Sequence, residues 1–163
     1  MTNTNGLDMF ISISVQFSEF SSIKYEADNN IIKLELALEG VLEEEGKQEF
    51  ITNINKCLDC LHKLRNSNPQ ISKLTFEDLP GITLISFYRD AETLTEEELH
   101  LFTTMLKESF NSLIIREEEN MLSLEYYKKE IKKSLLKKIN KTNTPSNNFF
   151  AYREEGRVFV FNK

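Results

Sequence analysis

Apolar and polar residues alternate strictly along residues 10–17 and again along residues 32–38. This period of two is typical of a half-buried β-strand, whose successive side chains point to opposite faces. A shorter candidate strand, residues 23–27, lies between them and is followed by an Asp-Asn-Asn turn signal at residues 28–30. The N-terminal part of the chain therefore predicts an antiparallel meander of three strands.

The helical period replaces this alternation between Lys47 and Leu64. One helical face collects the following apolar side chains: Phe50, Ile54, Cys57, Leu58, Leu61 and Leu64. After a terminating Asn-Ser-Asn-Pro segment, residues 72–76 predict a strand. Residues 82–88 are apolar on both faces, which predicts a strand in the centre of a sheet.

A second helix has a clear sequence signal at its start. Thr95 followed by Glu98 forms a capping box, in which the two side chains satisfy free backbone N–H groups of the first turn. Its predicted buried stripe is Leu99, Phe102, Leu106, Phe110 and Leu113. Residues 82–144 contain neither glycine nor proline. The sequence therefore leaves open whether this helix continues to Asn140 or ends before a third helix that starts near Glu117.

Glutamate triplets at residues 43–45, 96–98 and 117–119 support helix starts, where the positive end of the helix dipole favours carboxylates. The element order βββ-α-ββ-α-α-ββ predicts an α+β fold. In this fold two or three helices cover one face of an antiparallel sheet, and the chain ends in a β-hairpin.

The predicted organisation is a flexible N-terminus at residues 1–8, a single α+β domain at 9–141, and a polar loop with the hairpin at 142–163. One domain is the usual outcome for 163 residues. The hairpin docks either on its own domain or on a partner, because an isolated hairpin is not stable in water. In element order alone, residues 10–115 resemble the small dimeric secretion chaperones and, less closely, the longin and roadblock scaffolds of trafficking and GTPase regulation.

Charge is distributed unevenly along the chain. The formal net charge is −6, yet seven lysines lie between residues 128 and 141. The predicted lysine-rich helix 127–141 is compatible with a solvated surface helix, a contact with a protein, or attachment to an anionic membrane or nucleic acid. Nucleic acid is disfavoured because the rest of the chain would repel a phosphate backbone. No secretory signal or membrane-length apolar run is visible, so the expected location is the cytoplasm.

Candidate catalytic chemistry is sparse. Cys57 and Cys60 form a C-x-x-C pair near His62, but a zinc site needs about four ligands and a redox pair would lie at a helix start. We therefore expect a core cysteine and a half-buried neighbour, with His62 and His100 at helix surfaces. The five scattered glycines exclude a phosphate-binding loop. No catalytic residue, metal site or cofactor is predicted.

The C-terminal segment instead points to protein contact. Its aromatic side chains and the lysine-rich helix supply the interface candidates Phe149, Phe150, Tyr152, Phe159, Phe161, Tyr127, Lys128 and Lys132. The favoured function is a non-catalytic protein-binding module, such as a small acidic adaptor, chaperone or inhibitor, acting as a homodimer or on a protein partner. The alternative is a small enzyme whose site combines Tyr88, Arg89 and Asp90 with a histidine.

Overall fold

The structure is a computed structural model, and it describes residues 4–115, 148–154 and 157–162. The described helices are α1 (Thr4–Gln16), α2 (Glu44–Leu64) and α3 (Glu96–Phe110), followed by a 3-10 turn at Asn111–Leu113. The described strands are β1 (Ser22–Glu26), β2 (Ile31–Glu39), β3 (Ser72–Leu79), β4 (Ile82–Asp90), β5 (Asn148–Glu154) and β6 (Arg157–Asn162).

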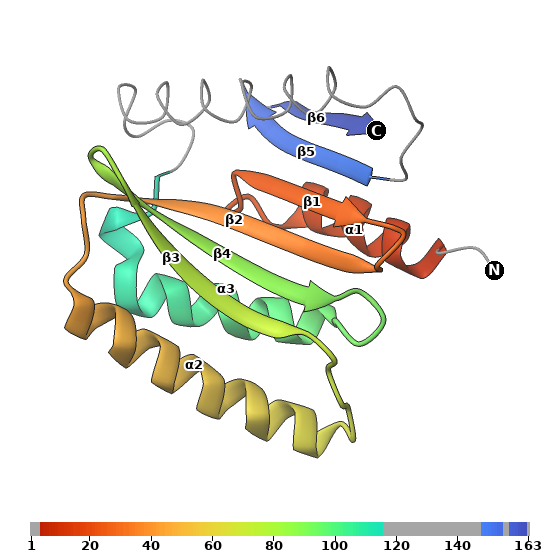
Figure 1. The fold of residues 1–163 in the computed structure, drawn as a ribbon, viewed down its shortest axis with the longest axis horizontal. Coiled ribbons are helices and arrows are strands. Elements are labelled where there is room, and N and C mark those ends of the chain that lie inside the picture. The colour runs from red at the N-terminus through yellow and green to blue at the C-terminus, as the bar shows by residue number, and fades with distance from the viewer. Residues whose placement is uncertain (1–3, 116–147, 155–156, 163) are drawn as a thin grey trace.

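All six strands belong to one antiparallel sheet with the order β3-β4-β2-β1-β5-β6 (Figure 1). The hairpin of β5 and β6 lies at one end of this sheet and β3 lies at the other. The predicted α+β class is confirmed, and so is the C-terminal hairpin.

The three helices pack against the same face of the sheet. The aromatic contacts show this most directly, since Phe10 of α1 lies against Tyr25 and Phe102 of α3 stacks on Phe87 at 4.5 Å between ring centroids. Phe50 of α2 meets the ring of Phe76 edge-on. These residues belong to one continuous hydrophobic cluster, which forms the core of the described fold.

The prediction of a strand at residues 10–17 is wrong, because these residues belong to helix α1. The pattern fits both periods: Phe10, Ile13 and Phe17 are spaced like one face of a helix, and all three are buried in the core. Ile11 and Val15, which the strand interpretation placed on the buried face, are 50% and 70% exposed. The first predicted strand of the meander is therefore replaced by a helix that covers β1.

The remaining predicted strands of the body of the domain are confirmed, with small changes at their ends. β2 and β4 pair along their whole lengths, and both are interior strands of the sheet. Asn30 and Gly81, which lie in the turns before β2 and β4, have φ angles of 55° and 78°. Such left-handed angles explain why an asparagine and a glycine are found there.

Helix α2 buries three of the six residues of its predicted stripe, Phe50, Ile54 and Leu58. Cys57 and Leu61 are half-buried, and Leu64 is exposed. Leu64 is the last residue of the helix and lies past the sheet. Its position around the helix axis therefore no longer determines whether it is buried.

Helix α3 begins at the predicted N-cap, where the hydroxyl of Thr95 accepts a hydrogen bond from the backbone N–H of Glu98 at 3.2 Å. The other half of the predicted capping box is wrong, because the Glu98 carboxylate accepts hydrogen bonds from Arg89 and His62 and not from the backbone of Thr95.

Helix α3 ends at Phe110, so it does not continue to Asn140. The 3-10 turn follows, and Ile114 then forms a β-bridge with Leu38, which returns the chain to the sheet. The predicted third helix, including Tyr127, Lys128 and Lys132, lies outside the described residues.

Candidate functional site

A cluster of charged side chains is buried where β4 ends and α3 begins. Arg89 and Asp90 are the last two residues of β4, Glu98 lies in the first turn of α3, and His62 lies in the last turn of α2. Arg89, Asp90 and Glu98 are buried, and the His62 ring is largely covered. The sequence-based enzyme alternative singled out Arg89, Asp90 and a histidine, and the structure brings these three together.

Every nitrogen of the Arg89 guanidinium donates a hydrogen bond. Nε and one terminal nitrogen reach the two carboxylate oxygens of Glu98 at 2.7 and 3.1 Å. The other terminal nitrogen donates to Asp90, to the hydroxyl of Thr93 at 3.1 Å and to the carbonyl of Ile71 at 3.0 Å. A buried guanidinium with this many partners is held in place, and it is inaccessible to solvent.

Asp90 is held on several sides. Its carboxylate accepts hydrogen bonds from the Thr93 hydroxyl at 2.6 Å and from the backbone N–H of Ile71 at 3.2 Å. Burial by itself raises the pKa of Asp90, but these hydrogen bonds and the Arg89 charge outweigh it, so the pKa lies below its ordinary value. Asp90 is therefore an ionised structural carboxylate, which is unsuited to act as a general acid.

Glu98 links all three elements of the cluster. It accepts the two hydrogen bonds from Arg89 and one from Nε2 of His62, so its carboxylate joins α3 to both β4 and α2. Next to it, the guanidinium of Arg65 pairs with Glu97 at the surface. Sequence reasoning treated Glu98 only as a helix-start residue and missed this role. The available signal was an arginine inside an otherwise apolar strand, which requires a buried partner.

The other residues of the enzyme alternative lie elsewhere. Tyr88 points to the opposite face of the sheet, where the amino groups of Lys33 and Lys73 lie 5.5 and 5.7 Å from its ring centroid. The His100 ring packs against Phe17 at 4.9 Å between centroids. Tyr88 and His100 therefore do not contribute to the charged cluster.

The cysteine pair lies near the C-terminal end of α2, as predicted. Both thiols are free: Cys57 is half-buried and Cys60 is exposed, so each is more exposed than the sequence suggested. Across the described residues, no three His, Cys, Asp or Glu side chains are arranged to hold a metal ion.

The aromatic residues of the hairpin divide between the two faces of the sheet. Phe149 points toward the helices and lies 6.0 Å from both Phe10 and Tyr25, measured between ring centroids. Phe150 and Tyr152 point to the other face and form a separate small cluster with Phe161. The Tyr152 ring stacks on Phe159 at 5.3 Å and on Phe161 at 5.8 Å. Four of the five predicted hairpin candidates thus form one aromatic cluster.

Strand β5 pairs with β1 of the same chain, so the hairpin is docked on its own sheet and β6 forms the edge. Within the described part of the chain, β6 pairs with β5 alone. Phe159 and Val160 of β6 are 36% and 53% exposed. Sequence reasoning named Phe159 but not Val160, although the valines alternate with the phenylalanines along the strand.

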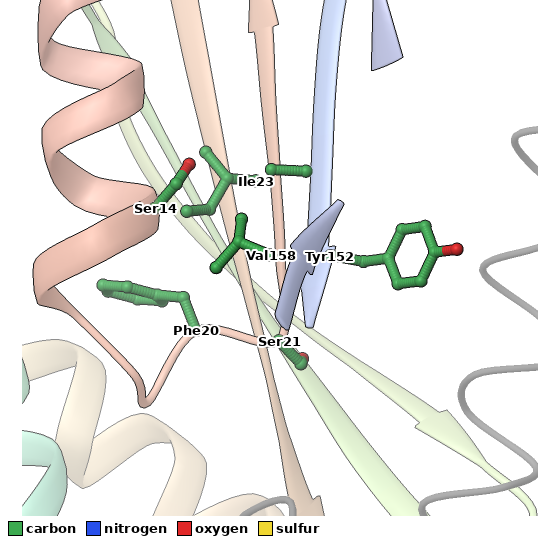
Figure 2. Close-up of a pocket in the computed structure, with 7 residues that line it drawn as sticks. Ser14, Phe20, Ser21, Ile23, Tyr152 and Val158 are labelled. Carbon is green, nitrogen blue, oxygen red and sulfur yellow. The ribbon is translucent and has the colours of Figure 1, made fainter. Parts of the chain in front are cut away.

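A small hollow of about 150 Å³ marks the junction between α1, β1 and the hairpin (Figure 2). Ser14, Phe20, Ile23 and Val158 point into it, whereas the Tyr152 ring is directed away, toward the opposite face of the sheet. The hollow is too narrow to admit a water molecule. It therefore shows where the hairpin meets α1 and does not provide a ligand site.

Comparison of the chain with known protein families, with curated proteins and with solved structures gave no match in any of the three searches. In the described part of the chain, no helix is both long enough and apolar enough to span a bilayer.

Proposed function

We propose that this chain is a non-catalytic protein-binding module, such as an acidic cytoplasmic adaptor, chaperone or inhibitor, that binds through its C-terminal hairpin. The observation that carries this proposal is the edge strand β6, whose Phe159 and Val160 side chains are exposed beside an aromatic cluster. An edge strand presents unpaired backbone groups to which a strand of another protein can add. Exposed aromatic and aliphatic side chains beside such an edge supply apolar contact area.

The charged cluster gives less support to the enzyme alternative. The guanidinium of Arg89 and the carboxylates of Asp90 and Glu98 are buried and hydrogen-bonded to one another, to His62 or to Thr93. The hollow at the hairpin has none of these residues in its wall. A catalytic group must reach a substrate, so this cluster is better suited to holding β4, α2 and α3 together.

A capture experiment with matched variants tests the proposal. Val160→Lys places a charge on the β6 edge, and Val41→Lys is the control, because Val41 is 60% exposed in the loop between β2 and α2. Tagged wild-type protein and both variants are incubated with native lysate, and captured proteins are quantified by mass spectrometry. Circular dichroism confirms that each variant is folded.

The proposal expects proteins that wild type and Val41→Lys retain and that Val160→Lys loses. Capture that all three proteins share equally would contradict binding through β6. Wild-type protein that captures nothing and does not self-associate would contradict the protein-binding role itself.

A further inference from the structure

The two edge strands of the sheet, β3 and β6, differ in how well they are protected against pairing with a strand of another molecule. The β3 edge carries the charged residues Lys73, Glu77 and Asp78, and Asp78 is bonded to Lys47 of α2 at 2.9 Å. Strand β6 has one charged residue, Arg157, at its first position. Charged side chains are the usual protection of an edge strand, so β3 is protected, whereas in the described residues β6 has no such protection beyond Arg157.

The β6 sequence is complementary to itself. Val160 is paired with Ala151 and Ala151 with Ile23, so Val158 and Val160 lie on the helix-covered side of the sheet. Phe159 and Phe161, which pair with Tyr152 and Phe150, lie on the other side. When two copies of β6 pair antiparallel about a two-fold axis, side chains on the helix-covered side of one copy lie beside side chains on the same side of the other copy. A register that centres on Phe159 or on Val160 therefore sets valine against valine and phenylalanine against phenylalanine.

Helix α1 exposes an apolar side chain on the flank next to this strand. At 100° per residue, Ile11 follows Ser14 around the helix, and Ser14 faces Val158 across the small hollow. Val15 lies further around, closer to Ser12, whose hydroxyl donates to Glu96 of α3 at 2.9 Å. Ile11 thus lies on the hairpin side of α1, where it is 50% exposed, whereas Val15 points away from the sheet.

We infer that the partner of β6 is a second copy of this chain, bound antiparallel through β6 so that the two sheets become continuous. This inference rests on the proposed function and names the partner. Both copies of α1 then lie on the same side of the joined sheet, flanking the central valines, and Ile11 of each copy lies beside them. The aromatic clusters of the two copies meet on the opposite side.

The size of this surface indicates a reversible dimer. Side chains of Ile11, Phe159 and Val160 that are 36–53% exposed leave on the order of 250 Å² of apolar surface on each copy. With the paired backbone included, the interface buries somewhat less than about 1,000 Å² in total, which is the size of weak, transient complexes. Because Arg157 is the one charged residue of β6, association should change little with added salt.

The mass of the protein in solution tests the dimer. Light scattering is measured over about 1–300 μM, a range that brackets the affinity expected for so small an interface. Wild type and Val41→Lys should rise from 19.0 kDa toward twice that mass, at low and high salt alike. Val160→Lys and Ile11→Lys, which place charges on β6 and on the adjacent flank of α1, should remain monomeric at least tenfold higher in concentration.

Cysteine cross-linking tests the geometry independently of charge. In a Cys57→Ser, Cys60→Ser background, Phe159→Cys or Val160→Cys should form a disulfide between copies under mild oxidation, and Val41→Cys should not. Cross-linking no faster than the Val41→Cys control would overturn the two-fold pairing. A folded wild type that stays monomeric throughout the range yet captures another protein through β6 overturns the dimer and leaves the proposed function standing. If the folded wild type stays monomeric and also captures nothing, both the dimer and the proposed function are overturned.

Discussion

Arg89 and Glu98 form an ion pair that is inaccessible to solvent, with Nε of Arg89 2.7 Å from a carboxylate oxygen of Glu98. The pair connects the end of the central strand β4 to the first turn of α3. Removing one member of a buried pair leaves the other charge without compensation, which typically costs 3–5 kcal/mol. We therefore expect Arg89→Met to lower the free energy of unfolding by about 4 kcal/mol in urea denaturation.

The exposed pair of Arg65 and Glu97 provides the control for this prediction. It also ends at the first turn of α3, which it joins to the end of α2, but it lies at the surface, where water screens the charges. Arg65→Gln should leave the urea midpoint almost unchanged. Equal losses in Arg89→Met and Arg65→Gln would show that burial does not determine the contribution of these pairs.

The carboxylate of Asp90 predicts a dependence of stability on pH. Its pKa in the folded protein lies below the ordinary value of 3.8, because hydrogen bonds from Thr93 and Ile71 and the Arg89 charge outweigh the effect of burial. The stabilisation is therefore fully present above that ordinary value and is lost as the pH falls through the lower folded pKa. Between about pH 5 and pH 2, the free energy of unfolding should decline less in Asp90→Asn than in wild type.

Neutral pH supplies the second half of this test. Asp90→Asn should already be less stable at pH 7, by about 1–3 kcal/mol, because Arg89 loses a charged partner. Urea midpoints measured at several pH values for both proteins give the comparison. Parallel curves for the two proteins would mean that another group causes the acid sensitivity.

The N-cap of α3 predicts a smaller effect. The hydroxyl of Thr95 accepts a hydrogen bond from the backbone N–H of Glu98. This contact also fixes the turn that presents the Glu98 carboxylate to Arg89. Thr95→Ala should cost about 1 kcal/mol of stability, whereas Thr95→Ser retains the hydroxyl and should cost little. Thermal and urea unfolding of the two variants would decide this, and similar losses in both would exclude the hydroxyl as the cause.

Much of the fold was predictable because its signals are local. The alternation along β2, the apolar run of β4 and the helical stripe of α2 each arise from burial against one face. Residues 10–17 were misassigned because Phe10, Ile13 and Phe17 satisfy the helical period while the same segment also alternates. Only contact with the sheet distinguishes the two interpretations. The pairing of β5 with β1 is a contact between distant segments, for which no local pattern exists.

The charged cluster was predictable only in part. Arg89 and Asp90 were named in the enzyme alternative as residues at the end of an apolar strand, but their role depends on partners that the fold supplies. Glu98 and His62 come from two different helices, and sequence spacing does not show that they meet. Sequence spacing also did not show that Ile11 and Val15 are exposed, because their exposure follows from the helical conformation of the segment.

The contact of Gly6 with Tyr25 tests the placement of α1 against β1. A Cβ atom added at Gly6 would lie 2.2 Å from the Tyr25 hydroxyl oxygen and 2.9 Å from the side-chain oxygen of Asn30, which accepts that hydroxyl's hydrogen bond. Exchange of glycine for alanine normally stabilises a helix by about 0.5–1 kcal/mol. Here the clash should dominate, and Gly6→Ala should destabilise the protein by about 1–3 kcal/mol.

Gly46 of α2 gives the matched control, because a Cβ there meets no atom within 4 Å. Gly46→Ala should raise the urea midpoint, so the two glycine substitutions should have opposite signs. Tyr25→Phe removes the oxygen nearest the added methyl group and should recover part of the stability lost in Gly6→Ala. If Gly6→Ala instead stabilises the protein as much as Gly46→Ala does, α1 does not pack on Tyr25, and Ile11 does not lie beside β6.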